Sequence, residues 1–253
     1  MLAPERHRAI LERLAKAGAL RVSAIAAHLG VTEETVRRDL GRLACEGRLL
    51  RTHGGAVALS DDRRDLPFAV RQAAHHDAKV RIARQALEHV REGDVIGLDA
   101  SSTAHEVARL LPDIPVTVVC NALLAVLTLL NRRRVRVIAT GGTVDPPSRS
   151  LVGSFAERTL EQINLRRVFL SSKGVDFARG LSELDAAQAR IKSRMMAVAE
   201  EIILLVDHSK FGVRSVVFFG DVKDVDIVIT DAGAPREVMV ELEKLGIKAE
   251  RAG

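Results

Sequence analysis

Residues 31–43 read VTEETVRRDLGRL, a charged segment that directly follows a glycine. Val36, Leu40 and Leu43 are spaced i, i+4 and i+7, which predicts a helix with one apolar stripe, and Thr32 is suited to cap its start. Successive helical residues turn by about 100°, so the opposite face can be read directly. That face carries Glu34, Arg38, Gly41 and Arg42, with Thr35 and Arg37 on its flanks. The segment therefore predicts a helix whose arginines face outward.

Two further helices are expected before this one. Apolar spacing predicts a helix over residues 5–17 and a second one that follows Ser23 as N-cap and ends at Gly30. Two helices joined by a short turn, the second with an exposed polar face, are typical of a helix-turn-helix whose second helix enters the major groove. Arginine suits that role because its fork binds guanine edges and phosphates bidentately.

The segment that follows predicts a basic wing. Gly47 is expected to end the helix, and residues 48–57 alternate like a short hairpin around a Gly54-Gly55 turn. Such a turn lets backbone amides approach phosphates, and Arg51 and His53 can reach a groove. The alternative is an ordinary three-helix bundle with a capping hairpin and a solvated charged face.

Charge is concentrated at the N-terminal end of the 253 residues. Residues 1–57 carry ten basic and six acidic side chains, whereas the rest carries 28 and 27. The asymmetry indicates a polyanionic partner for the first part, or a merely solvated basic surface. Two cysteines without ligand spacing, Cys45 and Cys120, predict neither a disulfide nor a metal site. The charged N-terminus and the short apolar run 122–130 predict a cytoplasmic protein without a membrane span.

Residues 31–57, VTEETVRRDLGRLACEGRLLRTHGGAV, resemble the N-terminal winged helix-turn-helix of the DeoR family of bacterial transcription regulators. Thr32 stands where serine is more usual in that family. The resemblance implies double-stranded operator DNA as partner. We expect the carboxylate of Asp39 to orient an arginine, because it would repel phosphate. The expected DNA contacts are Thr32, Glu34, Thr35, Arg37, Arg38, Arg42, Arg51, His53, Gly54 and Gly55.

The remainder predicts an α/β domain. Residues 60–67 are polar and aperiodic, so we expect a linker over 59–78 between a winged helix-turn-helix domain, 1–58, and an α/β domain, 79–253. Apolar runs that alternate with helical stretches predict a mostly parallel sheet covered on both faces. These runs are 95–98, 116–119, 135–139, 168–170, 202–206 and 227–229.

Polar residues follow these strands, at the edge where open parallel sheets bind ligands. Ser101, Ser102 and Thr103 come where a helix begins, so hydroxyls, amides and the helix dipole can hold a phosphate, although simple N-capping explains them as well. A plain turn likewise explains Gly141-Gly142. Lys173, Lys192 and Lys210 are candidates for the compensating charge, while a surface position is the commoner fate of a residue such as Lys192.

The segments VIATGG, FLSSKGVD and ILLVDHSKFG resemble the C-terminal sensor domain of the same family. The resemblance implies a fold related to ribose-5-phosphate isomerase and CoA-transferases, and a phosphorylated sugar or related metabolite as effector. Ser101–Thr103 and Cys120 depart from the commoner family residues. The expected effector contacts are Asp99, Ser101, Ser102, Thr103, Asn121, Gly141, Gly142, Lys173, Gly174, Asp176, Lys192, Asp207 and Lys210.

These features predict a DNA-binding transcriptional regulator, a repressor of a carbohydrate-metabolism operon that a sugar phosphate releases from its operator. Paired half-sites predict a homo-oligomer, a dimer or tetramer. No catalytic residue, cofactor or metal is expected. The alternative is a sugar-phosphate isomerase-like enzyme fused to a DNA-binding module, with Asp99, Lys173, Asp176 and Asp207 in acid-base roles. A nucleotide switch is unsupported, because GxxxxGK[ST] and a GxGxxG after a strand are both missing.

Overall fold

The computed structural model describes residues 2–17, 19–45, 48–52, 54–58 and 68–253. These residues form two compact units, Met1–His76 and Asp77–Gly253. The boundaries expected at 58 and 78 remain predictions, since residues 59–67 lie outside the described ranges. Within those ranges, no helix is long and apolar enough to cross a membrane.

The N-terminal unit combines three helices with a small antiparallel sheet. Its elements are α1 (Ala3–Ala17), β1 (Ala19–Arg21), α2 (Val22–Leu29), α3 (Glu33–Cys45), β2 (Leu49–Thr52) and β3 (Gly55–Ala58), followed by α4 (Phe68–Ala73). The sheet order is β1-β3-β2. Its core joins Ile10 and Leu14 of α1, Ile25 of α2 and the α3 stripe. The winged helix-turn-helix is confirmed, whereas α4 occupies part of the range expected as an aperiodic linker.

Two helix ends in this unit, at Gly30 and Thr32, are as the sequence predicts. Gly30 ends α2 in a left-handed conformation, φ 64°, and the Thr32 hydroxyl accepts the Thr35 amide at 3.2 Å at the start of α3. The expected Ser23 cap is wrong. Helix α2 begins at Val22, directly after β1, and the Val22 amide donates to Gly54 O at 2.9 Å. Backbone pairing with the wing thus replaces a side-chain cap.

The wing is tied to β1, which was not expected. Thr52 pairs with Gly55, so Gly55 belongs to strand β3 rather than to the turn. Gly55 also pairs with Arg21, and a Cβ on it would lie 2.0 Å from the carbonyl oxygen of Leu20. Glycine is therefore required there by close backbone approach. His53 and Gly47 lie outside the described residues.

The C-terminal unit is built on a parallel sheet of seven strands in the order β15-β14-β12-β9-β4-β5-β6. The strands are β4 (Val95–Leu98), β5 (Val116–Cys120), β6 (Val135–Ala139), β9 (Arg167–Leu170), β12 (Ile202–Leu205), β14 (Ile227–Asp231) and β15 (Lys248–Ala252). The six expected apolar runs all form strands, which confirms the fold class. Strand β15 is polar in sequence and was not expected.

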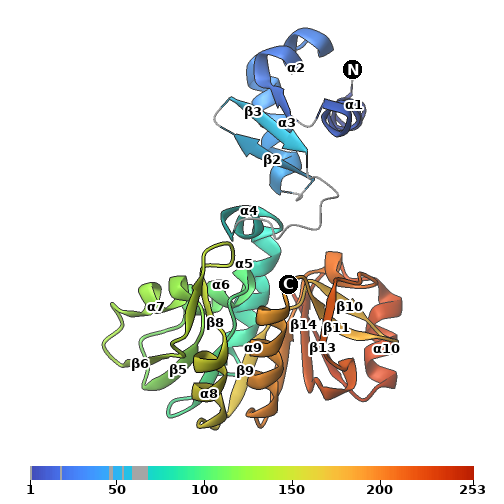
Figure 1. Ribbon diagram of the computed structural model, residues 1–253. Coiled ribbons are helices and arrows are strands. Elements are labelled where there is room, and N and C mark those ends of the chain that lie inside the picture. The colour runs from blue at the N-terminus through green and yellow to red at the C-terminus, as the bar shows by residue number, and fades with distance from the viewer. Residues whose placement is uncertain (1, 18, 46–47, 53, 59–67) are drawn as a thin grey trace. The chain divides into compact units, whose positions relative to one another are not determined.

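Helices cover both faces of this sheet (Figure 1). Residues of α5 (His76–Leu87), α6 (Ser102–Leu110) and α7 (Leu123–Leu129) share one apolar core, and residues of α8 (Ser154–Glu161), α9 (Ala186–Ala197) and α10 (Arg236–Lys244) share the other. Two small antiparallel sheets and two 3-10 turns complete the unit. They are β7 (Thr143–Asp145) with β8 (Ser150–Val152), β10 (Gly174–Asp176) with β11 (Gly180–Glu183) and β13 (Val217–Gly220), η1 (His208–Lys210) and η2 (Val222–Asp224).

Candidate DNA interface and effector site

Helix α3 has the two faces that its sequence predicts. Val36, Leu40 and Leu43 are fully buried, while Arg38 and Arg42 are exposed on the other side. Arg37 is exposed as well, but its guanidinium lies 2.6 Å from the Glu33 carboxylate one turn earlier. Arg38 is therefore better placed than Arg37 to offer its fork to a base.

Asp39 holds α3 against α1. Its carboxylate accepts from Arg6 Nε at 2.7 Å and Nη2 at 3.1 Å and lies 3.0 Å from His7 Nε2. Burial raises the pKa of Asp39, but the hydrogen bonds from Arg6 and His7 outweigh burial, and the pKa of this carboxyl is lowered. The expectation that Asp39 orients an arginine is confirmed, and the arginine belongs to α1.

The wing brings a further basic group to α3. The guanidinium of Arg51 lies over Gly41, where an added Cβ would be 3.6 Å from Arg51 Nη1. Gly41 sits on the exposed side of α3, between Arg38 and Arg42. Helix and wing thus present Arg38, Arg42 and Arg51 on one basic surface.

The buried polar residues of the C-terminal unit lie at the point where the strand order of the parallel sheet reverses. From β4 the chain proceeds outward through β5 to β6, and then returns to place β9 on the other side of β4. Open α/β sheets bind ligands in the crevice beyond the carboxyl ends of strands at such a switch point. Here those ends carry Asp99 after β4 and Ser171 after β9.

Asp99 joins these two strand ends. Its carboxylate accepts the Ser101 amide at 3.0 Å and the Ser171 amide at 2.9 Å, and it forms an ion pair with Lys192 of α9. Lys192 Nζ also donates to Ser171 O at 2.8 Å and lies 3.4 Å from the Glu183 carboxylate. Burial disfavours the charged lysine, but the two carboxylates outweigh burial and the pKa of Lys192 is raised. Lys192 is 4% exposed, so the alternative of a surface position is wrong, and its contact with the effector stays a prediction.

The neighbouring strand ends carry further predicted residues. The Ser101 hydroxyl caps α6 by accepting the Ala104 amide at 3.0 Å, so it has the capping role that its position allows, and Ser102 and Thr103 are buried in the first turn. Asn121, after β5, is fully buried and donates from Nδ2 to Leu151 O at 3.2 Å. Its Oδ1 has no hydrogen-bond partner among the described residues.

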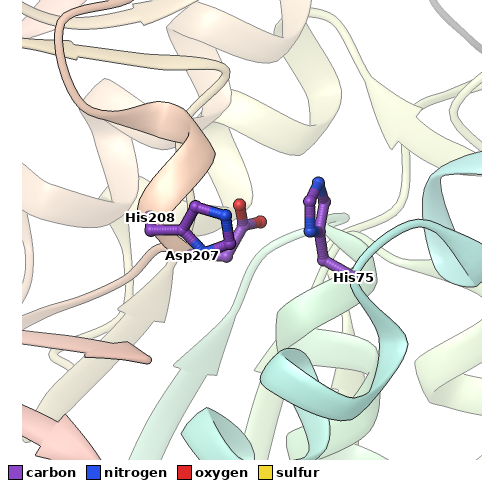
Figure 2. A group of neighbouring side chains, drawn as sticks. All are labelled: His75, Asp207 and His208. Carbon is purple, nitrogen blue, oxygen red and sulfur yellow. The ribbon is translucent and has the colours of Figure 1, made fainter. Parts of the chain in front are cut away.

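Asp207 and His208 follow β12 at the start of η1 (Figure 2). Asp207 caps this turn by accepting the Ser209 amide at 3.0 Å. His208 Nδ1 lies 2.8 Å from the carboxylate of Asp231, at the end of the adjacent strand β14. Burial raises the pKa of Asp231, but its hydrogen bonds with His208 outweigh burial and lower that pKa. Lys210 ends the turn and is half-buried.

Several predicted residues also have clear structural roles. Gly142 adopts φ 108°, and a Cβ on it would lie 2.5 Å from Val152 O. A Cβ on Gly174 would likewise lie 2.3 Å from Val213 O. Asp176 accepts two backbone amides in the β10–β11 turn and lies 2.5 Å from Arg214 Nε. The Arg214 hydrogen bond is the main reason that the pKa of Asp176 is lowered. Gly141 is exposed at φ 69°, and the Lys173 amide donates to Ser182 O.

Comparison with known proteins gives the same two-part division. A model of the DeoR-like helix-turn-helix domain matches residues 6–62, and a model of the DeoR C-terminal sensor domain matches residues 74–232. The chain belongs to the DeoR family. It is thus a DNA-binding transcriptional regulator and not an enzyme.

Curated relatives of this DeoR-family chain match over nearly their full length. An uncharacterized HTH-type regulator of Bacillus subtilis, YulB, is 39% identical over 98% of this chain and 96% of its own. The L-fucose operon activator of Haemophilus influenzae is 36% identical, over 89% and 91%. The glycerol-3-phosphate regulon repressor of Escherichia coli is 32% identical, over 97% and 98%. Among solved structures, ribose 5-phosphate isomerase A of Methanocaldococcus jannaschii matches 55% of each chain, with 19% identity and a TM-score of 0.40.

The DeoR-family regulator has buried polar groups at this edge that the sequence did not indicate. Glu183 is the second carboxylate on Lys192, and Gln188, one turn before Lys192 on α9, donates to Ser148 and Ser150 of the β7–β8 hairpin. The i, i+4 spacing of Gln188 and Lys192 could have indicated a shared polar face. Nothing in the local pattern distinguishes Glu183 from a surface carboxylate.

Proposed function

We propose that this regulator represses a carbohydrate-metabolism operon by binding operator DNA through α3 and the wing. The observation that carries this proposal is the basic surface of Arg38, Arg42 and Arg51. Helix α3 is held in the unit by its buried apolar stripe and by the hydrogen bonds of Asp39. The other proposed DNA contacts are Thr32, Glu34, Thr35, Arg37, His53, Gly54 and Gly55. Phosphate contacts position the helix, and a base contact by Arg38 supplies specificity.

The effector proposed for this regulator is a phosphorylated sugar or polyol bound at the carboxyl edge of the parallel sheet. The sensor-domain match and the name of the glycerol-3-phosphate regulon repressor support this class of ligand. The structure offers the N-terminus of α6, where the helix dipole favours an anion, and Lys210 at the end of η1 as a cation. The effector favours a conformation with poor operator affinity, and the coupling is reciprocal.

The working form proposed for the protein is a cytoplasmic homo-oligomer with two-fold symmetry. One winged module contacts few base pairs, so two modules on paired half-sites raise both affinity and specificity. Operator half-sites should then be spaced by whole helical turns of DNA.

Fluorescence anisotropy tests the proposal directly. Labelled DNA from upstream of the protein's own gene and of neighbouring genes is titrated with protein, with and without glycerol 3-phosphate and a set of aldose and ketose phosphates. Specific binding that one phosphate ester releases is the expected result, and Lys210→Ala should blunt that release while operator affinity is retained. Binding that an ester strengthens would make the protein an activator or co-repressed regulator, and sequence-indifferent binding unmoved by every ester would contradict the proposal.

A further inference from the structure

Lys192 has no hydrogen-bond donor left for a ligand. An ammonium has three N–H groups, and those of Lys192 face the Asp99 carboxylate, Ser171 O at 2.8 Å and the Glu183 carboxylate at 3.4 Å. The centroid of the Phe219 ring lies 5.8 Å from Lys192 Nζ. A phosphate cannot approach this lysine without displacing one of these groups.

The cluster around Lys192 is negative and rich in acceptors. Two carboxylates, those of Asp99 and Glu183, face one ammonium, so the formal charge of the cluster disfavours an anion. Asp99 already accepts from two backbone amides and from Lys192. Glu183 accepts fewer hydrogen bonds. Among the described residues its only donor besides Lys192 is the Leu184 amide, at 3.3 Å, whereas a carboxylate has about four acceptor positions.

Asn121 provides a second and independent observation. Leu98 pairs with Cys120, so Asn121 stands at the end of the strand next to Asp99 and at the same level. Its Oδ1 is a buried acceptor without a donor in the described parts of the chain. Buried polar atoms are almost always hydrogen-bonded, and each exception calls for an explanation such as a ligand group.

We propose that the switch point binds hydroxyl groups of the effector, that Glu183 is the specificity-determining acceptor and that Asn121, level with Asp99 on the neighbouring strand, is a second acceptor. Lys192 binds no effector atom and instead holds Asp99, Ser171 and Glu183 in place. The phosphate contacts the start of α6 and Lys210 instead of Lys192. The inference rests on the proposed function, because it assigns the two ends of the same ligand.

The variant Glu183→Gln tests the hydroxyl end of the effector separately from its phosphate end. Lys192 keeps Asp99 as partner, so the fold tolerates the change, while the charge-assisted hydrogen bond to a hydroxyl is lost. Isothermal titration calorimetry of the full chain then compares inorganic phosphate with glycerol 3-phosphate and with ribose 5-phosphate and its 2-deoxy analogue. Phosphate affinity should stay within about 2-fold or rise, whereas the tightest hydroxylated ester should lose about 10-fold or more.

Three further results decide the matter. If a hydroxyl contacts the Glu183 carboxylate, the difference in affinity between ribose 5-phosphate and its 2-deoxy analogue should be smaller for Glu183→Gln than for the wild type. The double variant Lys192→Met with Glu183→Gln, which removes one positive and one negative charge and so keeps the net charge of the cluster, should bind inorganic phosphate within about 3-fold of the wild type. Glu200→Gln, an exposed carboxylate just before the start of β12, is the matched control and should change nothing.

The inference is overturned if Glu183→Gln weakens phosphate and hydroxylated esters equally or alters neither, or if the double variant is stable but loses phosphate binding. Failure of the proposed function looks different, since the wild type would then bind none of the esters and no inorganic phosphate. Free ribose and glycerol are titrated in that case. Binding of a free polyol that Glu183→Gln abolishes keeps the hydroxyl site, and absence of all binding rejects both proposals.

Discussion

The two units of this protein place their charges in opposite ways. In the N-terminal unit the arginines proposed for function, Arg38 and Arg42, stand on the outside of a helix that is packed on its other side through Val36, Leu40 and Leu43. In the C-terminal unit the charged residues at the switch point, Asp99 and its lysine partner among them, are buried. The difference fits the two proposed ligands, because a duplex is read by a surface, whereas a small molecule is bound by groups that surround it.

From this comparison we expect the largest loss of stability for a substitution of Lys192. Lys192→Met leaves the carboxylates of Asp99 and Glu183 buried without their counter-charge, and removal of one partner from a buried ion pair costs about 3–5 kcal/mol. Urea denaturation should show this loss in the C-terminal unit. Lys244→Met is the control, because Lys244 forms an exposed pair with Glu241 on α10 and its loss should cost about 0.5 kcal/mol or less. A loss below about 1 kcal/mol for Lys192→Met would show that the buried cluster is not held by this charge.

A smaller effect is expected at Asp39, the buried carboxylate of the N-terminal unit. Asp39→Asn removes charged hydrogen bonds to Arg6 and His7, which should cost about 1.5–3 kcal/mol. Because the folded pKa of Asp39 is lowered, its contribution is complete above the unfolded value of about 3.9 and disappears as the pH falls through the lower folded pKa.

Thermal unfolding followed by circular dichroism from pH 7 to pH 3 measures this contribution. The gap in Tm between wild type and Asp39→Asn should be constant near neutral pH and should narrow below about pH 4. Glu12→Gln, which alters an exposed ion pair with Arg8 on α1, should leave the pH profile unchanged. A gap that stays constant down to pH 3 would contradict the assignment of this stability to the ionised carboxylate.

The mildest perturbations concern the exposed surface, where folding should not change at all. Arg38→Ala is expected to weaken operator binding by about 1–3 kcal/mol and to relax preference at one base pair. Arg37→Ala should cost less, because its guanidinium is already held by Glu33. Anisotropy with operator and nonspecific DNA measures both, and Arg13→Ala on α1 is the control. Equal losses for Arg37 and Arg38, or none for Arg38, would reject the geometry proposed for α3.

The exposed surface could be predicted from sequence because it depends on local periodicity. Val36, Leu40 and Leu43 define the buried side of α3, and the other side follows from helix geometry alone. The apolar strands of the parallel sheet are equally local signals, since each is a short run that is buried on both faces. Even the alternative explanation for Ser101, simple N-capping, could be stated in advance and is observed.

The buried cluster could not be predicted in the same way, because its partners are distant in sequence. Lys192 is 93 residues from Asp99, and on its own helix it reads as one more basic residue between Ile191 and Arg194. Strand β15 was missed because an edge strand can be polar, and Gly55 was misplaced because the approach of β1 is a tertiary contact.

The same separations bear on how the chain matures during synthesis. Asp39 follows Arg6 by 33 residues, so this pair can form while the rest of the protein is still being made. At about 5–20 residues per second, Asp99 waits about 5 to 20 seconds for Lys192 to be added. A nascent chain can thus complete its DNA-binding unit before its sensor domain exists, and we expect chains truncated by premature termination to bind DNA without responding to the proposed effector.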